Sequence, residues 1–138
     1  MKKILILVSL LSIQNLGKAQ NMPKVGDYFE ISNTNLGKIY SPPPLDFLDK
    51  AVCNFNGINF NLGIKNNKIC YISTSDPRFK LNKKQYIGKK LNEIKTYGEL
   101  INIPGWGNYI EIDGGWNATF TYKEFNSNSV VLFLFKNK

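Results

Sequence analysis

The sequence predicts an α+β domain, mostly antiparallel sheet built from hairpins and a meander, with one or two short helices packed on it. Three observations predict this class. Runs rich in Ile, Val, Phe, Tyr and Thr recur at short intervals, separated by clusters of Gly, Asn and Pro. Asn-Gly and Gly-Gly pairs stand between apolar runs, where tight hairpin turns need such residues. Helical spacing of apolar residues occurs over one convincing stretch, from Lys89 to Tyr97.

The first nineteen residues carry the pattern of a secretory signal peptide. Two lysines follow Met1, an almost unbroken apolar run extends from Ile4 to Leu11, and small residues surround Ala19. Charged, apolar and small segments in this order are typical of a cleavable signal, and the apolar run is too short to span a bilayer. We predict cleavage after Ala19, which leaves residues 20–138 as a single secreted domain, periplasmic or extracellular.

The chain after the signal is expected to begin with a strand and one helical turn. A strand is expected at Asp27–Ile31. The prolines at positions 42–44 lack amide donors and interrupt any pairing, and one helical turn is expected at Leu45–Lys50 after them.

A three-stranded meander is predicted from Ala51 to Thr74. Asn56-Gly57 favours a type I′ turn, because both central residues of that turn take positive φ. A two-residue loop there gives the pairs Phe55–Ile58, Cys53–Phe60 and Ala51–Leu62. This register puts the apolar side chains on one face, and a one-residue slip would scatter them. A second turn at Asn66-Asn67 is expected to pair Ile64 with Ile69 and Leu62 with Tyr71.

The two cysteines, Cys53 and Cys70, test this meander. An oxidising compartment favours a disulfide between them. In the predicted register they lie on strands that flank a middle one, about 9–10 Å apart, whereas a disulfide needs Cα atoms within about 7 Å. Either the bridge is absent or the meander is wrong, and we favour its absence. Both cysteines lie far from the cleavage site, so no thiol is placed there to carry a lipid anchor.

The second half begins with an irregular basic connection after Asp76 and continues into the helix at Lys89–Tyr97. Its apolar stripe is Leu91, Ile94 and Tyr97, and Gly98 is expected as the C′ residue. A helix of this length must lie against the sheet to be stable.

A final antiparallel group is expected from Asn108 to Phe135. A three-residue loop at Asp113-Gly114-Gly115 pairs Ile112 with Trp116 and Ile110 with Ala118, with a glycine in the left-handed conformation. Val130–Phe135 is apolar on both faces, which predicts a central strand.

The charge of the chain is concentrated in one stretch. The net charge of +8 falls to +5 when three lysines leave with the signal. Residues 78–95 contain seven basic residues and one carboxylate: Arg78, Lys80, Lys83, Lys84, Lys89, Lys90, Lys95 and Glu93. Such a patch can meet an anionic partner, a polyanionic glycan or a membrane surface, or it is an ordinary solvated face. We expect no nucleic-acid partner, because the protein is exported and has one arginine, and no membrane span.

The sequence lacks residues and motifs that several kinds of catalysis and cofactor binding need. The chain has no histidine, which removes the usual general base and the commonest zinc ligand. No phosphate-cradling glycine loop occurs, so we predict no cofactor, no metal and no catalytic residue. The carboxylates of Glu111 and Asp113, with Glu99 near, leave a small hydrolase as one alternative.

Aromatic residues beside glycine-rich turns are the best candidates for binding. Trp106, Tyr109 and Trp116 have the side chains that most often anchor interfaces, and such rings also stack on sugars. The alternative is that the two tryptophans cap the end of a small core.

One stretch carries a family resemblance. The fourteen residues Ile87–Leu100, with a glycine before a short helix and a second glycine after it, resemble a stretch of the β-lactamase-inhibitor-protein-like and outer-membrane-assembly small lipoprotein folds. The whole chain also resembles small secreted proteins of the Bacteroidetes. The resemblance implies an exported α+β domain that binds protein, and it transfers no functional residue. The chain lacks the lipid-anchoring cysteine of the lipoproteins and the duplicated domain of the inhibitor.

The leading hypothesis is therefore an exported, non-enzymatic binding protein of the cell envelope, such as an inhibitor or immunity protein. Its expected partner is another protein, of acidic character where it meets the basic stretch, and the expected contacts are Trp106, Tyr109, Trp116, Arg78, Lys80 and Lys84. Two alternatives remain: a glycan- or peptidoglycan-binding module that uses the same aromatic residues, and a small hydrolase that uses the carboxylate pair.

Overall fold

A computed structural model describes residues 21–31, 36–42, 46–121 and 123–137. The expected signal peptide lies outside these residues. Within the described part of the chain, no helix is long and apolar enough to cross a membrane.

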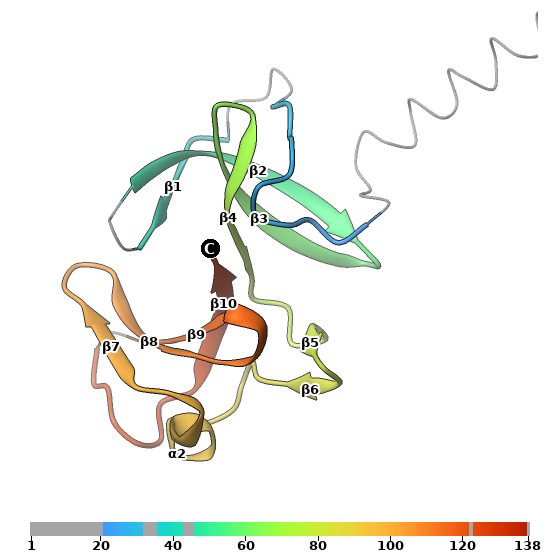
Figure 1. The fold of residues 1–138 in the computed structure, drawn as a ribbon. Coiled ribbons are helices and arrows are strands. Elements are labelled where there is room, and N and C mark those ends of the chain that lie inside the picture. The colour runs from blue at the N-terminus through green and yellow to red at the C-terminus, as the bar shows by residue number, and fades with distance from the viewer. Residues whose placement is uncertain (1–20, 32–35, 43–45, 122, 138) are drawn as a thin grey trace, which may run out of the picture.

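The fold is one curled antiparallel sheet of eight strands (Figure 1). In spatial order the strands are β1 (Lys38–Ser41), β2 (Asp46–Phe55), β3 (Ile58–Lys65), β4 (Lys68–Thr74), β10 (Val131–Lys136), β9 (Asn117–Phe120), β8 (Gly107–Glu111) and β7 (Leu100–Ile103). The curl brings the edge strands β1 and β7 to the same side of the view in Figure 1. The result is a half-barrel that is open between its two edges.

The remaining elements are short. They are β5 (Lys80–Leu81), β6 (Lys84–Gln85), helix α2 (Leu91–Ile94) and two 3₁₀ turns, η1 (Lys95–Tyr97) and η2 (Asp113–Gly115). The mostly antiparallel sheet is confirmed, while the described chain is nearer to all-β than the expected α+β class. The small β5–β6 ribbon replaces the irregular connection expected there, because Asn82 and Lys83 both take positive φ, at 49° and 68°, and form a tight turn.

The first predicted hairpin is confirmed residue for residue. Phe55 pairs with Ile58, Cys53 with Phe60 and Ala51 with Leu62. Asn56 and Gly57 take φ of 51° and 81°, as a type I′ turn requires.

The second hairpin follows the prediction only at its turn. Ile64 pairs with Ile69 as expected, but Leu62 pairs with Ile72 rather than with Tyr71. Cys70 is the extra residue of a bulge at this point, and the residues after it change faces. The change turns Ile72 into the main core and Tyr71 into a second apolar cluster on the other face.

The sheet buries apolar side chains on both faces. One face carries the main core, which the segments around Phe79, Ile87 and Ile94 cover. The other face carries a smaller cluster of four buried residues: Leu48, Tyr71, Tyr109 and Phe135. Gly63 lets this second cluster close, because a Cβ at that position would lie 2.6 Å from Leu48 Cδ1.

Two expectations for the start of the chain are wrong. Asp27–Ile31 is not a strand; it makes a single bridge, from Tyr28 to Lys68. Residues 46–50, expected to be helical, begin β2 and pair with β1, a strand that the sequence analysis did not identify. This pairing buries Leu48 in the second cluster, and the burial outweighs the local helical tendency.

The predicted helix is confirmed in place but is shorter. Helical structure begins at Leu91, because Lys90 is extended and pairs with Val130. The Lys90 N–H donates to Glu93 Oε2 at 2.7 Å and so caps the first turn. Gly98 is not a left-handed C′ residue, since its φ is −175°. Glycine is needed there because a Cβ would lie 3.0 Å from the Glu111 carbonyl oxygen.

The final antiparallel group is confirmed. Ile110 pairs with Ala118, and the Ile112 N–H donates to the Trp116 carbonyl at 2.7 Å across the expected three-residue loop. Gly114 and Gly115 both take positive φ. The last strand is central, between β4 and β9.

Both cysteines are free, Cys53 buried and Cys70 half-buried. Burial raises the pKa of the Cys53 thiol to about 11, so it is a poor nucleophile at neutral pH. We expect iodoacetamide to alkylate Cys70 in the folded protein and Cys53 only after unfolding in urea. Peptide mass spectrometry after native and denatured pulses measures this order. Protection of both thiols in urea without reductant would reveal a bridge and contradict the meander.

Candidate functional site

A cleft of about 570 Å³ lies across the open side of the curled sheet. Its walls come from β1, β2, β3, β4, β10, the segment after β4 and the turn between β7 and β8. The lining residues are Ile39, Tyr40, Phe47, Asn61, Tyr71, Ser73, Thr74, Ser75, Gly105, Trp106 and Phe133. We call it the aromatic cleft. Since β1 and the β7–β8 turn belong to opposite edges of the sheet, the site depends on the curl.

Two exposed rings form one wall of the aromatic cleft. Tyr40 and Phe47 are 50 % and 61 % exposed, and they are paired across β1 and β2. Their ring centroids lie 4.5 Å apart in an edge-to-face arrangement. Large apolar rings exposed to this extent gain free energy when a ligand covers them.

Trp106 forms the opposite wall and is held in place from below. Its ring contacts the edges of three other rings, with centroid distances of 5.0 Å to Phe135, 5.9 Å to Tyr109 and 5.9 Å to Phe133. The backbone N–H of Trp106 donates to the Ile103 carbonyl at 3.0 Å, in a turn whose Gly105 has a φ of 79°. The half-buried indole is therefore presented to the cleft in a fixed position.

The polar groups of the cleft are neutral. They are the amide of Asn61 and the hydroxyls of Tyr40, Tyr71, Ser73, Thr74 and Ser75, and no charged side chain is among the lining residues. Burial raises the pKa of Tyr71 to about 12, so its hydroxyl stays protonated at physiological pH. A mostly apolar wall with a few neutral donors and acceptors is typical of a small-ligand site.

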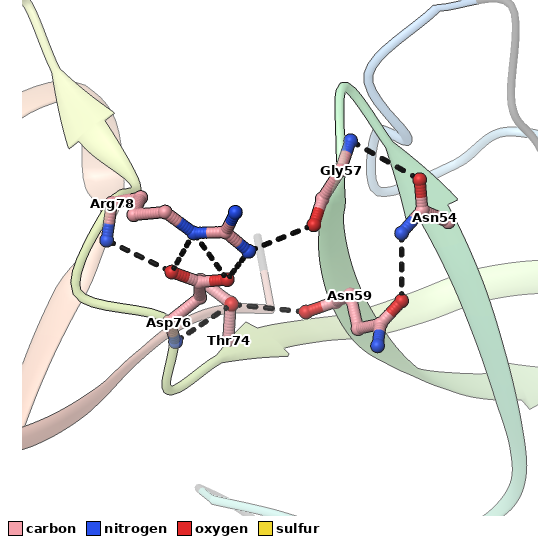
Figure 2. A network of polar contacts seen from close by, with 6 residues as sticks. All are labelled: Asn54, Gly57, Asn59, Thr74, Asp76 and Arg78. Carbon is pink, nitrogen blue, oxygen red and sulfur yellow. Dashed lines mark hydrogen bonds and ion pairs between the residues drawn. The ribbon is translucent and has the colours of Figure 1, made fainter.

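A hydrogen-bond network braces the polar end of the cleft (Figure 2). The Arg78 guanidinium contacts both carboxylate oxygens of Asp76 and donates to the Gly57 carbonyl at 2.9 Å, at the tip of the β2–β3 hairpin. Thr74 Oγ1 donates to the Asn59 carbonyl at 3.0 Å and accepts from the Asp76 N–H at 3.2 Å. These bonds fasten the 74–78 segment to the hairpin.

Asp76 and Arg78 give this network a pH dependence. The Arg78 guanidinium holds the pKa of Asp76 at about 2, below the ordinary value of about 4. Because the folded pKa is depressed, the contribution to stability is complete above pH ~4 and is lost as the pH falls toward 2. We expect Arg78→Met to have a lower free energy of unfolding than the wild type at pH 7. As the pH falls from ~4 toward 2, the variant should lose less of that free energy than the wild type does.

Urea unfolding at a series of pH values measures this difference, and Lys80→Met is the matched control because Lys80 is an exposed neighbour on β5. Equal pH dependence in the wild type and Arg78→Met would show that the network does not contribute to the stability of the fold.

The structure does not bring the three predicted aromatic contacts to one surface. Trp106 lines the aromatic cleft. Tyr109 is 5 % exposed and lies beneath it in the second cluster. Trp116 is also 5 % exposed and packs in the main core against Phe79, with ring centroids 5.1 Å apart.

The three predicted basic contacts also have separate environments. Arg78 is engaged in the network of Figure 2. Lys80 is exposed on β5, and Lys84 lies on β6, where its Nζ donates to the Tyr97 hydroxyl at 3.2 Å.

The two carboxylates, Glu111 and Asp113, lie in different surroundings. Glu111 is exposed, and Asp113 Oδ2 accepts a hydrogen bond from the Tyr86 hydroxyl at 2.6 Å. Neither residue is among those that line the aromatic cleft. Among the described residues, no group of three or more His, Cys, Asp or Glu side chains is placed to hold a metal ion.

Sequence reasoning missed Tyr40, Phe47 and Phe133. Phe47 stood within the helical turn expected after the prolines, Tyr40 stood in no expected element, and Phe133 was placed only in the expected central strand. Comparison with protein families, curated proteins and solved structures finds no match for this chain.

Proposed function

We propose that this chain is a non-enzymatic binding protein that acts outside the cytoplasm and takes a neutral carbohydrate in the aromatic cleft. The observation that carries the proposal is the lining of the cleft, in which Trp106, Tyr40 and Phe47 meet neutral polar groups and no charge. The C–H faces of sugar rings stack on aromatic rings, and their hydroxyls exchange hydrogen bonds with amides and hydroxyls.

The absence of charge in the lining argues against an acidic ligand at this site, since the basic residues of the protein lie elsewhere in the described chain. Binding by stacking and neutral hydrogen bonds is only weakly screened by salt. The aromatic cleft is therefore expected to retain its ligand at an ionic strength that releases proteins bound by charge.

A protein partner, as for an inhibitor or immunity protein, is the second candidate. The exposure of Phe47 and Tyr40 favours it, because protruding aromatic side chains anchor many interfaces. In that case the cleft would receive an apolar side chain of the partner rather than a sugar.

A retention assay on insoluble cellulose, chitin, mannan and xylan tests the proposal, with low-salt and high-salt arms. We expect retention on at least one polysaccharide in both arms and its loss in Trp106→Ala. Tyr28→Ala is the matched control, because Tyr28 is 69 % exposed and does not line the cleft. Retention on none, or retention that salt abolishes, would refute the carbohydrate assignment.

A further inference from the structure

A second cleft, of about 430 Å³, lies within the basic stretch of the chain. It is lined by Lys84, Gln85, Tyr86, Lys89, Glu93, Ile94 and Tyr97, from β6, the loop after it, α2 and η1. It shares no lining residue with the aromatic cleft. Unlike the aromatic cleft, it has charged walls, so its ligand must differ in chemistry. We call it the basic cleft.

The walls of the basic cleft carry more positive than negative charge, with two lysines and one carboxylate among the lining residues. Across the described chain, no lysine between positions 80 and 95 forms an ion pair with a carboxylate. Glu93 is the one carboxylate on the wall, and its Oε2 already accepts the Lys90 N–H at 2.7 Å. The ammonium groups of Lys84 and Lys89 thus line the cleft without an ion pair, while the Glu93 carboxylate on its wall and Asp113, whose charge acts on Lys84, offset part of their positive charge.

Lys84 is held in place by Tyr97. Its Nζ donates to the Tyr97 hydroxyl at 3.2 Å and lies 5.4 Å from the centroid of that ring. The Tyr86 ring packs edge-to-face on Tyr97 at 5.6 Å and donates its hydroxyl proton to Asp113. The hydrogen bond from Lys84 keeps the pKa of Tyr97 below its usual range. The cleft thus presents an ammonium group beside the hydroxyl of Tyr97.

We propose that the basic cleft binds a phosphate or sulfate group, with the ammonium groups of Lys84 and Lys89 as charge partners and the Tyr97 hydroxyl as a further donor. Lysine binds such oxyanions as a point charge, and hydrogen bonds to a charged acceptor are roughly twice as strong as neutral ones. The amide of Gln85 lies on the same wall and adds a donor. The group can arrive as the free anion or as a substituent on a larger molecule.

NMR titration of the ¹⁵N-labelled protein with sodium sulfate and with sodium phosphate, at ionic strength held constant with sodium chloride, tests the proposal. We expect saturable shifts in residues 84–97 for both oxyanions. Replacing both lysines, Lys84→Met with Lys89→Met, should weaken binding by about tenfold or more, since two charge-assisted contacts are lost. Lys123→Met is the control, because Lys123 is exposed and outside the cleft.

Tyr97→Phe provides a second variant that keeps the ring and removes only the hydroxyl, and we expect it to weaken binding by about threefold to tenfold. A sulfated oligosaccharide identifies the source of the group. Tighter binding than free sulfate assigns a glycan substituent, equal affinity assigns the free anion, and both outcomes support the site. Shifts that match those from chloride alone, or an unchanged affinity in the folded double variant, would overturn it.

Discussion

Replacing Phe135 with alanine is expected to lower the free energy of unfolding by about 3–5 kcal/mol, the usual cost of removing a buried phenylalanine side chain. Phe135 is fully buried on the central strand β10. Its ring centroid lies 5.0 Å from that of Trp106, 5.2 Å from Tyr109 and 5.8 Å from Tyr71. The variant therefore leaves a void under the aromatic cleft as well as within the second cluster.

Urea unfolding followed by far-UV circular dichroism measures this loss. Leu132→Ala is the matched control, because Leu132 lies on the same strand but is 46 % exposed. We expect the control to change stability by no more than about 1 kcal/mol. A Phe135→Ala loss as small as that of the control would mean that the second cluster contributes little to the stability of the fold.

Replacing Trp106 with alanine is expected to weaken carbohydrate binding by about 30-fold or more, which corresponds to the roughly 2 kcal/mol that defines a binding hot spot. The indole lines the aromatic cleft and is preorganised by three ring contacts. Removing it takes away the stacking surface without adding a charge.

The measurement is isothermal titration calorimetry of the variant and the wild type with the soluble oligosaccharide of the best polysaccharide. Tyr40→Ala and Phe47→Ala, on the opposite wall, should each weaken binding, whereas Tyr28→Ala should change affinity by less than about twofold. Unchanged affinity in a folded Trp106→Ala variant would place the ligand elsewhere.

Local patterns predicted the parts of the fold that local chemistry determines. The Asn56-Gly57 turn and the alternation around it specify a register within twelve residues, and the structure has that register. The loop at residues 113–115 was predictable for the same reason. Both depend on the conformational preferences of adjacent residues, not on distant contacts.

The parts that the sequence analysis missed depend on contacts between distant segments. Strand β1 exists because β2 pairs with it, and the bulge at Cys70 decides which face receives Tyr71. Trp116 is buried because Phe79, far away in the sequence, packs against it. Glycine-rich flanks are the same for a tryptophan in a cleft and one in the core, so Trp106 and Trp116 could not be told apart from sequence.

The expected carboxylate pair and the basic patch illustrate the same point. Asp113 is engaged by Tyr86, and Arg78 by the Gly57 carbonyl, through contacts between segments that lie far apart in the sequence. Of the predicted binding residues, Trp106 lines one cleft, Lys84 lines another and Lys80 is exposed on β5.

The claim that Trp106 is the ligand-contacting tryptophan is tested most directly by the indole N–H signals in a ¹H–¹⁵N correlation spectrum. The chain has two tryptophans, so two signals are expected, and Trp106→Phe assigns them. On titration with a panel of neutral oligosaccharides, at least one sugar should shift the Trp106 signal saturably while the signal of the buried Trp116 stays in place. No shift of the Trp106 signal with any sugar of the panel, or a shift confined to Trp116, would contradict the account.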